Sequence, residues 1–459
     1  MGIRAVKLSH YASFLITCAF VAACSPPEEI LPGERFGLRD VLPEDSSEDA
    51  VDAADAAPVV NSNTVAAAEN QSVPISLPAQ VNHANWTHRA GAPDHSVQHP
   101  ALSRAPTLLW AANIGQGNDR KHRITADPVV SNGAIFTLDS RSTVTAVTVA
   151  GAVIWSTDLT PATDRADDAS GGGLAVEGNR IFVTTGFGVL NALDTGSGAL
   201  LWSQKLDAPA SGAPSVVGGV VYVATKENRG FAVDAANGRI KWQLAGTPDS
   251  SGILGVSAPA VTDQLAIFPF SSGEMVAALR DDGTRAWNAL VIGHRRGRGY
   301  SSITDITGEP VVVNGVIYAG NAVGRTIAMT EAGERLWTAK DGATGPVWVT
   351  GGSVFLISDE AKLVRLDATS GARIWAIDLP YFTTEKVRRR KAIYANFGPV
   401  LAGGNLWVAS SDGVMRGFNP VDGSLTSSVE IPNGAATRPA IVNGVAYLVN
   451  TNGQLLALR

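Results

Sequence analysis

A short unit that ends in tryptophan recurs along the chain and constrains its fold more than any other feature. The stretch DTGSGALLW (194–202) shows the spacing, with Gly198 four residues before Trp202. The same spacing is found at Gly151–Trp155, Gly198–Trp202, Gly238–Trp242, Gly283–Trp287, Gly333–Trp337 and Gly371–Trp375. A seventh copy keeps Gly423 but has Ser427 in the tryptophan position. Repeats of this length, built from short strands, are typical of β-propeller blades.

A second repeated unit predicts a β-hairpin in each blade. Examples are DPVVSNGAIF (127–136), EPVVVNGVIY (309–318) and RPAIVNGVAY (438–447), and the chain holds eight such copies with variants. Asn-Gly between two apolar runs is a strong hairpin signal, because both turn residues take positive φ. A proline at the start of a strand removes no hydrogen bond that the sheet needs.

The two ends of the repeat region predict how the ring closes. The eighth hairpin copy is followed by QLLALR (454–459), with no tryptophan unit after it. A single strand-like stretch around Trp110, PTLLWAANI (106–114), comes before the first hairpin. If that strand completes the last blade, the chain forms an all-β, eight-bladed propeller of four-stranded antiparallel blades over residues 107–459. A helical solenoid is disfavoured because the apolar residues alternate with period two.

The tryptophan unit is expected to be structural. An Asp at the start of the unit can accept backbone N–H groups in a turn, and the tryptophan can pack between blades. The Asp position is held by Val147, Leu279 and Met329 in other copies, so no shared reaction can depend on it. The spacing resembles the tryptophan-docking motif of pyrroloquinoline-quinone (PQQ) dehydrogenase propellers, in which the motif is also structural.

The N-terminal region reads as an export signal followed by a tether. Arg4 and Lys7 precede the apolar run ASFLITCAFVAA (12–23), which is short for a membrane span. Small residues before Cys24 resemble a lipoprotein signal, which predicts a signal peptide over 1–23 and lipidation of Cys24. A plain secretory signal is the alternative. Residues 24–80 are expected to form an acidic disordered tether and residues 81–106 a surface wrap.

Charge is unevenly distributed along the chain. Residues 26–80 hold eleven Asp/Glu and two Arg, whereas the whole chain has a net charge of −6. The repeat region is therefore nearly neutral, and nothing suggests nucleic-acid binding. Two basic loops stand out, GHRRGRGY (293–300) and EKVRRRKAIY (385–394). They are expected on the same face of the ring, as solvated loops or as a docking patch for an acidic partner.

Residues for catalysis are poorly supplied. No cysteine follows Cys24, and the seven histidines lie at positions 10, 83, 88, 95, 99, 122 and 294, outside the predicted blade strands. The pair His95–His99 has metal-ligand spacing only in a helix, which Asp94 and Pro100 disfavour. We therefore expect no catalytic residue, no metal site and no cofactor. A PQQ-dependent dehydrogenase and a ligand-binding or sensor propeller remain alternatives.

A lipoprotein signal, an acidic tether and repeats such as EPVVVNGVIYAGN and GARIWAIDL together resemble the BamB family of outer-membrane protein assembly factors. The resemblance implies a non-catalytic scaffold on the periplasmic face of the outer membrane. It also implies docking on a POTRA domain of the barrel subunit BamA, as a monomer within a hetero-complex.

The resemblance places the partner contacts in two connectors, SSGILGVSAPA (250–260) and SSITDITGEPVVVNGV (301–316). By position it implies contacts from Ile253 and Asp305. Ser251, Leu254 and Thr307 depart from the family pattern, and Ile303 lies in the second connector. The neighbouring basic loop could compensate for these departures. The predicted partner-binding residues are Ser251, Ile253, Leu254, Ile303, Asp305, Thr307, Arg295, Arg296 and Arg298.

Overall fold

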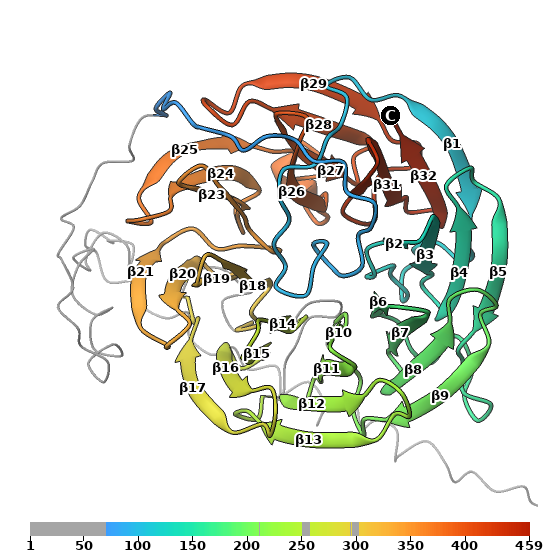
Figure 1. Cartoon of the computed structure of the whole chain (residues 1–459). Coiled ribbons are helices and arrows are strands. Elements are labelled where there is room, and N and C mark those ends of the chain that lie inside the picture. The colour runs from blue at the N-terminus through green and yellow to red at the C-terminus, as the bar shows by residue number, and fades with distance from the viewer. Residues whose placement is uncertain (1–69, 211, 250–257, 294, 296–302) are drawn as a thin grey trace, which may run out of the picture. The chain divides into compact units, whose positions relative to one another are not determined.

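The computed structural model describes residues 70–459, apart from residues 211, 250–257, 294 and 296–302. Its strands form eight four-stranded sheets, which are arranged as the blades of a ring (Figure 1). This confirms the predicted all-β, eight-bladed propeller. The predicted signal peptide, Cys24 and most of the predicted tether lie outside the described residues. Within the described part, no helix is long and apolar enough to cross a membrane.

Each blade runs from an inner strand to an outer strand at the rim of the ring (Figure 1). Blades 1 to 4 consist of β2 (Val129–Ser131), β3 (Ala134–Leu138), β4 (Thr143–Thr148) and β5 (Val153–Asp158); β6 (Gly172–Glu177), β7 (Arg180–Thr185), β8 (Val189–Asp194) and β9 (Leu200–Lys205); β10 (Ser215–Val217), β11 (Val220–Ala224), β12 (Arg229–Asp234) and β13 (Ile240–Ala245); β14 (Ala260–Val261), β15 (Leu265–Pro269), β16 (Glu274–Leu279) and β17 (Arg285–Leu290).

Blades 5 to 8 follow the same plan, and the last takes its outer strand from the start of the repeat region. They consist of β18 (Gly308–Val313), β19 (Val316–Asn321), β20 (Arg325–Thr330) and β21 (Arg335–Ala339); β22 (Trp348–Thr350), β23 (Ser353–Ile357), β24 (Lys362–Asp367) and β25 (Arg373–Asp378); β26 (Asn396–Ala402), β27 (Asn405–Ser410), β28 (Val414–Phe418) and β29 (Leu425–Glu430); β30 (Ala440–Val442), β31 (Val445–Val449), β32 (Gln454–Leu458) and β1 (Leu108–Asn113). The one described helix is the 3₁₀ turn η1 (Val387–Arg389) between blades 6 and 7.

The tryptophan unit joins six of the eight blades to the following blade by a hydrogen bond. In six blades the indole N–H donates to a backbone carbonyl in the turn of the following blade, at 2.8–3.2 Å. The pairs are Trp110–Val149, Trp155–Thr195, Trp202–Ala235, Trp242–Arg280, Trp287–Glu331 and Trp337–Ala368. The glycine of that turn lies under the ring. A Cβ on Gly198 would stand 2.5 Å from Trp155, and one on Gly371 would stand 2.5 Å from Trp337.

Hydrogen bonds within the turn explain why several copies of the unit begin with aspartate. Asp194 Oδ1 accepts hydrogen bonds from the backbone N–H groups of Gly196 and Ser197, at 3.1 and 2.9 Å. The hydrogen bonds from Ser197 hold the pKa of Asp194 below its usual value. The carboxylate therefore stabilises the turn. The carbonyl of Thr195 in this turn accepts the hydrogen bond from the Trp155 indole.

The ring closes where one tryptophan is absent. β1 pairs antiparallel with β32, and Thr107 and Arg459 exchange backbone hydrogen bonds at 2.7 and 2.9 Å. Blade 8 therefore has no turn between its third and fourth strands that could receive an indole from blade 7. Blade 7 has Ser427 at that position. The missing tryptophan thus coincides with the blade boundary that has no acceptor turn.

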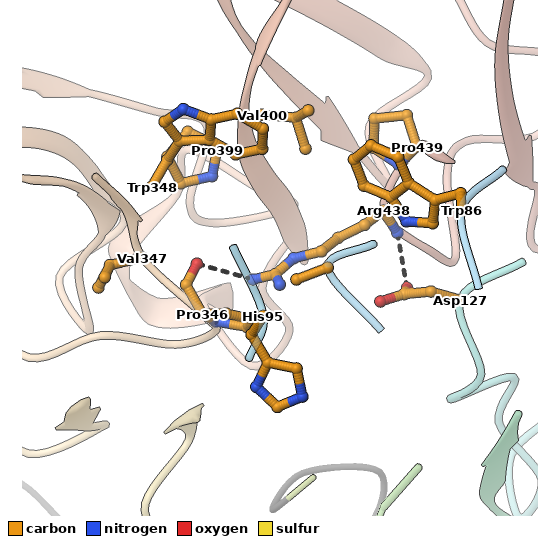
Figure 2. A pocket seen from close by; sticks show the side chains of 11 residues that line it. Trp86, His95, Asp127, Pro346, Val347, Trp348, Pro399, Val400, Arg438 and Pro439 are labelled. Carbon is orange, nitrogen blue, oxygen red and sulfur yellow. Dashed lines mark hydrogen bonds between the residues drawn. The ribbon is translucent and has the colours of Figure 1, made fainter. Parts of the chain in front are cut away.

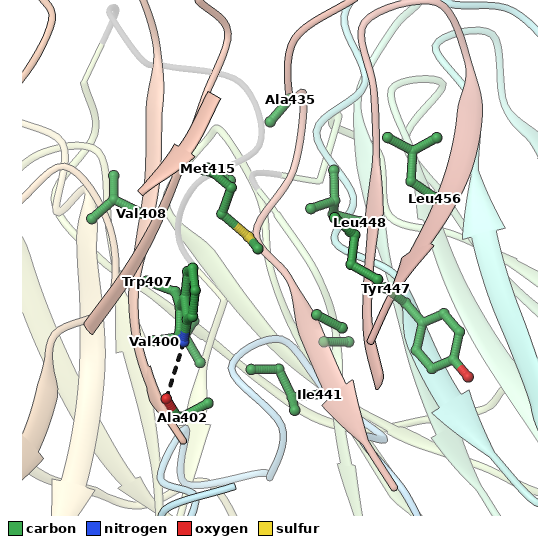
Figure 3. Close-up of a cluster of buried hydrophobic side chains, with 14 of the residues drawn as sticks. Val400, Ala402, Trp407, Val408, Met415, Ala435, Ile441, Tyr447, Leu448 and Leu456 are labelled. Atoms are coloured by element: carbon green, nitrogen blue, oxygen red, sulfur yellow. Dashed lines mark hydrogen bonds between the residues drawn. The ribbon is translucent and has the colours of Figure 1, made fainter. Parts of the chain in front are cut away.

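Apolar side chains fill the space between adjacent blades. The largest cluster spans blades 6 to 8 and extends into blade 1 and residues 86–102. It includes the fully buried Trp407, whose indole N–H donates to the Ala402 carbonyl at 3.0 Å (Figure 3). Met415 of blade 7 and Leu448 of blade 8 face each other across the boundary between these two blades (Figure 3). Packing between blades is therefore continuous across the boundary that lacks a tryptophan.

We expect Gly198→Ala to destabilise the ring more than Gly219→Ala. Both glycines have positive φ, +71° and +75°, so both substitutions carry the same backbone strain. A Cβ at Gly219 meets nothing within 4 Å, whereas one at Gly198 meets Trp155. We expect an additional loss of about 1–3 kcal/mol for Gly198→Ala from overpacking. Urea unfolding measures the difference, and equal losses would contradict the docking role of Gly198.

Candidate docking surface and the closed channel

The two sides of the ring differ in what covers them. Strands alternate in direction, so the hairpin turns of all blades lie on one side and the connectors between blades on the other. Residues 70–106, which we call the strap, lie over the middle of the ring on the side of the hairpin turns (Figure 1). The connector side carries the two loops for which docking was predicted.

The strap makes hydrogen bonds to all eight blades. The contacts, in blade order, are Trp86 with Val130, Thr87 with Val176, His88 with Val216, Pro93 with Val261, Asp94 with Val312, Val73 with Arg365, Pro100 with Gly403, and His83 with Asn443. Five of these contacts use the free inner edge of the first strand of a blade. The strap thus satisfies backbone groups that would otherwise line an open channel.

The sequence had predicted a surface wrap that begins at residue 81. The chain is in contact with blade 6 already at Asn70, whose side chain accepts a hydrogen bond from the Ala376 backbone at 2.9 Å. Trp86 is buried at 2% exposure, and the following Thr87 and His88 bond to the inner strands of blades 2 and 3. The segment therefore starts earlier than predicted and closes the channel instead of lying on the outer surface.

Three strap histidines are buried and bonded to backbone groups. His88 Nε2 accepts from the Val216 N–H at 3.0 Å, and His99 Nε2 accepts from the Gly404 N–H at 3.0 Å. His95 Nδ1 lies 2.7 Å from the Pro310 carbonyl, to which it donates. Burial lowers the pKa of His88 to about 4 and that of His95 to about 3. Both rings are therefore neutral at pH 7.

Arg89 of the strap meets three charged residues of the blades, Asp127, Glu309 and Arg438, and we call these four residues the charge quartet. Glu309 and Arg438 are buried, and the side chains of Arg89 and Asp127 are 11% and 9% exposed. Arg89 Nε lies 2.8 Å from Glu309 Oε1 and 3.8 Å from Asp127 Oδ2. The Arg438 backbone donates to Asp127 Oδ1 at 2.9 Å, and its guanidinium reaches the Pro346 carbonyl at 3.4 Å (Figure 2). Burial raises the pKa of Glu309, and the charge of Arg89 opposes this rise. When both carboxyl groups are ionised, the two positive and two negative charges balance, as buried charges require.

Electrostatics keeps the arginines of the quartet charged. Burial alone would lower the pKa of Arg89, but the carboxylates of Glu309 and Asp127 outweigh it and raise the pKa. Burial lowers the pKa of Arg438 to about 10, against the opposing effect of Asp127. Both guanidinium groups therefore stay protonated at neutral pH.

The sequence analysis missed this quartet, although a signal for three of its members was present. Asp127, Glu309 and Arg438 each stand directly before the proline that opens a hairpin copy. The same position holds small residues in other copies, at Ala213, Ala258, Gly345 and Gly398. Because the inner strands start at the axis, this position points a side chain into the channel.

The space left beside the quartet is small. The cavity lined by Trp86, His95, Asp127, Trp348 and Arg438 measures about 20 Å³, which is room for about one water. Sites for small molecules and cofactors usually measure about 300–1,000 Å³. No group of His, Cys, Asp or Glu residues in the described part of the chain has the arrangement of a metal site. The axis as folded does not fit a quinone cofactor.

A larger groove opens on the strap side between blades 5 and 6. It measures about 540 Å³ and is lined by the strap segments 76–78 and 95–99 together with Asn314 and Thr350. Its walls come from the strap as much as from the blades, so its shape depends on the strap remaining in place.

On the connector side, the described part of the second predicted docking loop is held tightly. Ile303 is half-buried, whereas Asp305 and Thr307 are 1% and 3% exposed. Thr307 Oγ1 donates to the Ala343 carbonyl, and Thr304 Oγ1 lies 2.7 Å from the Ser271 carbonyl. A direct contact of Asp305 or Thr307 with a partner, as the sequence suggested, does not fit this burial. These side chains instead fix the path of the connector.

Arg295 is also engaged within the chain. Its guanidinium makes two hydrogen bonds to the buried carboxylate of Asp359, at 2.8 and 3.1 Å, and a third to the Lys340 carbonyl at 3.2 Å. The hydrogen bonds to Asp359 raise the pKa of Arg295. Arg295 therefore fastens the connector after blade 4 to blade 6, and its charge is already balanced. Ser251, Ile253, Leu254, Arg296 and Arg298 lie outside the described residues.

Comparison with known proteins agrees with this architecture. The family model described as outer membrane protein assembly factor BamB matches residues 140–377. The chain is 24% identical over 362 residues to a protein of that name from Yersinia pestis, covering 77% of this chain and 88% of the relative. The fold is similar to that of BamB from Moraxella catarrhalis, with a TM-score of 0.64 and 18% identity, covering 77% of this chain and 100% of that one.

A dehydrogenase shares the fold as well. The quinohemoprotein alcohol dehydrogenase from Comamonas testosteroni has a TM-score of 0.61 and 14% identity, covering 82% of this chain and 80% of that one. At this identity the likeness concerns the fold alone.

Because His88 and His95 of the strap are buried in the neutral form, we expect acid to lower the free energy of unfolding of the chain. In the unfolded chain these histidines bind protons below about pH 6.5, while His88 and His95 in the fold do so only near pH 4 and 3. Stability is therefore full above pH 6.5 and is lost as the pH falls toward 4. Each histidine contributes about 1.4 kcal/mol per pH unit to this loss.

The test compares urea unfolding at pH 7, 6, 5 and 4 for the native chain and for His88→Gln/His95→Gln. Glutamine can replace the hydrogen bonds but does not titrate. We expect the double variant to lose about 2–3 kcal/mol less per pH unit between pH 6 and 4. His83→Gln, which removes a half-buried strap histidine, is the control. An unchanged pH profile in the double variant would contradict the assignment.

Proposed function

The chain belongs to the family of the outer membrane protein assembly factor BamB, and on this basis we propose that it is a non-catalytic scaffold in outer-membrane protein assembly. The observation that carries the proposal is the family match over residues 140–377. That range includes both connectors in which docking was predicted, 250–260 and 301–316. The family match therefore supports docking through these connectors as well as the shared fold.

We propose that the connector side docks on a POTRA domain of a BamA-like barrel subunit, with the chain monomeric within that hetero-complex. Ile253 and Leu254 supply apolar anchors, because buried apolar side chains carry much of the affinity in such interfaces. Ser251, Ile303, Arg296 and Arg298 lie at the edge of the same contact. Thr307 and Arg295 hold the connectors in position through the contacts described above, and Asp305 is buried within the second connector.

The filled channel favours a scaffold role over the activity of a quinone-dependent enzyme. In this chain the axis holds the strap, the charge quartet and a cavity of about 20 Å³. A PQQ-dependent dehydrogenase would need that space for its cofactor, so this alternative requires the strap to leave. A ligand-binding or sensor propeller would use the groove beside the strap, where Asn314 and Thr350 offer polar groups.

We further propose that residues 1–23 are a lipoprotein signal peptide and that Cys24 carries the lipid. The acidic residues that follow then tether the ring to the periplasmic face of the outer membrane. A lipoprotein carries more than one acyl chain, which is what stable anchoring requires.

The docking proposal predicts that Ile253→Asp/Leu254→Asp weakens binding to the POTRA domains of the barrel subunit. Placing two carboxylates at apolar anchors should reduce affinity at least about tenfold. Isothermal titration of the purified proteins measures this. Leu200→Asp/Leu201→Asp is the matched control, because these two residues are exposed at the outer rim of blade 2, at 53% and 47%. Equal affinity of the docking variant and the native chain would rule out this contact.

Anchoring through Cys24 predicts a change of cell fraction. Cys24→Ser should move the chain from the outer-membrane fraction to the soluble periplasm and abolish incorporation of labelled palmitate. Cys18→Ser, which alters the other cysteine of the chain, should change neither. Loss of lipid in Cys18→Ser, or its retention in Cys24→Ser, would assign the anchor differently.

A further inference from the structure

The inner strand of blade 6, β22, differs from the inner strands of the first five blades in its contacts with the strap. In blade 1, Trp86 of the strap exchanges two backbone hydrogen bonds with Val130, at 2.7 and 2.8 Å, as an antiparallel bridge. The same position in blades 2 to 5 also donates its backbone N–H to the strap, at Val176, Val216, Val261 and Val312. Val349 is the equivalent residue of blade 6, and in the described part of the chain its backbone makes no hydrogen bond with the strap.

The register of the blade 6 hairpin shows where the backbone groups of Val349 point. A two-residue turn joins β22 to β23, and Thr350 pairs with Ser353 on either side of it. Residues that flank such a turn exchange hydrogen bonds with each other, so the next pair, Val349 and Val354, does not. The N–H and the carbonyl of Val349 therefore point away from β23, as those of Val130 point away from β3 in blade 1.

The edge at Val349 opens into a groove. Leu401 and Ile441 hold the equivalent position in the last two blades and are buried, at 0% and 1% exposure, whereas Val349 is half-buried. Val349 lines the groove of about 540 Å³ between blades 5 and 6. β22 is three residues long, which is roughly 10 Å of strand. The groove therefore exposes an unpaired strand edge of that length.

The walls of this groove are uncharged. Leu77, Val97 and Val313 contribute apolar side chains, and Gln98 and Thr350 contribute polar ones. No Asp, Glu, Lys or Arg is among the described residues that line it. An unpaired strand edge can bind the main chain of an extended peptide, while the side-chain pockets beside it give specificity. Walls without charge disfavour a charged side chain, because its desolvation would not be compensated.

The strap indicates which side chain suits such an edge. Residues opposite each other in an antiparallel bridge have their side chains on the same face of the sheet. In blade 1, Trp86 and Val130 lie in one apolar cluster and are buried, at 2% and 0% exposure. Val349 lacks such a cover and stays half-buried. A large aromatic side chain opposite Val349 would bury it in the same way.

We propose that the inner edge of β22 binds an extended, uncharged segment of a partner polypeptide, with an aromatic residue opposite Val349. The segment pairs with Val349 as Trp86 pairs with Val130, through one hydrogen bond from the Val349 N–H and one to its carbonyl. This site lies on the hairpin-turn side of the ring, opposite the connectors. The inference therefore goes beyond the proposed scaffold function and does not depend on it.

A peptide copied from the strap tests the site. The probe is acetyl-Asn-Gln-Ala-Asn-Trp-Thr-amide, which follows residues 82–87 with Gln in place of His83. Isothermal titration with the full chain measures its affinity, and hydrogen exchange locates it. We expect slower amide exchange at Val349 and no change at Val130, whose N–H is already bonded. Methylation of the tryptophan backbone nitrogen removes the donor to the Val349 carbonyl and should weaken binding at least about fivefold.

Two variants of the chain test whether the groove is the binding site. Gln98→Trp places a large ring in the groove from an exposed position of the strap, and it should weaken binding at least about fivefold. Gln80→Trp is the matched control, because Gln80 is exposed on the strap but does not line the groove. It should leave the affinity unchanged. Urea unfolding of both variants checks that the strap remains in place.

Three results would overturn the proposal. The first is no binding at about 1 mM peptide, the weakest affinity of interest here. The second is binding that tolerates N-methylation of the peptide or is weakened equally by the two tryptophan variants. The third is protection of Val349 in the chain without peptide that increases with protein concentration, because a second copy of the chain would then occupy the edge.

Discussion

The docking of each tryptophan onto the glycine turn of the next blade is the contact on which the ring depends. It combines a hydrogen bond to a backbone carbonyl with close packing over a residue that has no side chain. Because the acceptor is backbone, the aspartate of the turn is dispensable, and Val147 stands in its place before the carbonyl that receives Trp110. The boundary between blades 6 and 7 differs, because a side chain other than tryptophan makes the hydrogen bonds to the turn. Arg365 donates to the Pro420 and Val421 carbonyls, whereas the buried Trp375 packs without an indole hydrogen bond to the described residues.

A second system of contacts closes the ring independently of the tryptophans. The strap bonds to all eight blades, so opening the boundary between blades 7 and 8 would also break its contacts on both sides of that boundary, at Gly403 and Asn443. This matters because that boundary is the one without a tryptophan. The strap also decides which side of the ring is available: it covers the hairpin-turn side, whereas the connectors that distinguish one blade from another lie on the opposite side.

The sequence predicted the repeating parts of the structure and missed the parts that do not repeat. Blade number, closure by the strand around Trp110 and the structural role of the tryptophans followed from fixed spacing, because each copy faces the same packing problem. The strap has no periodicity, so its contacts with eight separate strands could not be inferred. Asp305 was assigned to a partner contact by its position in the family resemblance, which says nothing of burial, and here it is buried. The partner of Arg295, Asp359, lies in another blade and carries no local signal.

The charge quartet solves a problem that the repeat itself creates. Five blades offer the strap a valine at the same strand position, namely Val130, Val176, Val216, Val261 and Val312, so backbone hydrogen bonds alone would accept the strap in several rotational settings. Charged residues at the axis break this near-symmetry, because they precede the hairpin proline of blades 1, 5 and 8 only, as Asp127, Glu309 and Arg438. A strap rotated by one blade would place Arg89 beside small residues or beside Arg438, without a carboxylate at hydrogen-bonding distance, at a cost of several kcal/mol. The charge quartet fixes one position of the strap on a ring whose blades are otherwise nearly equivalent.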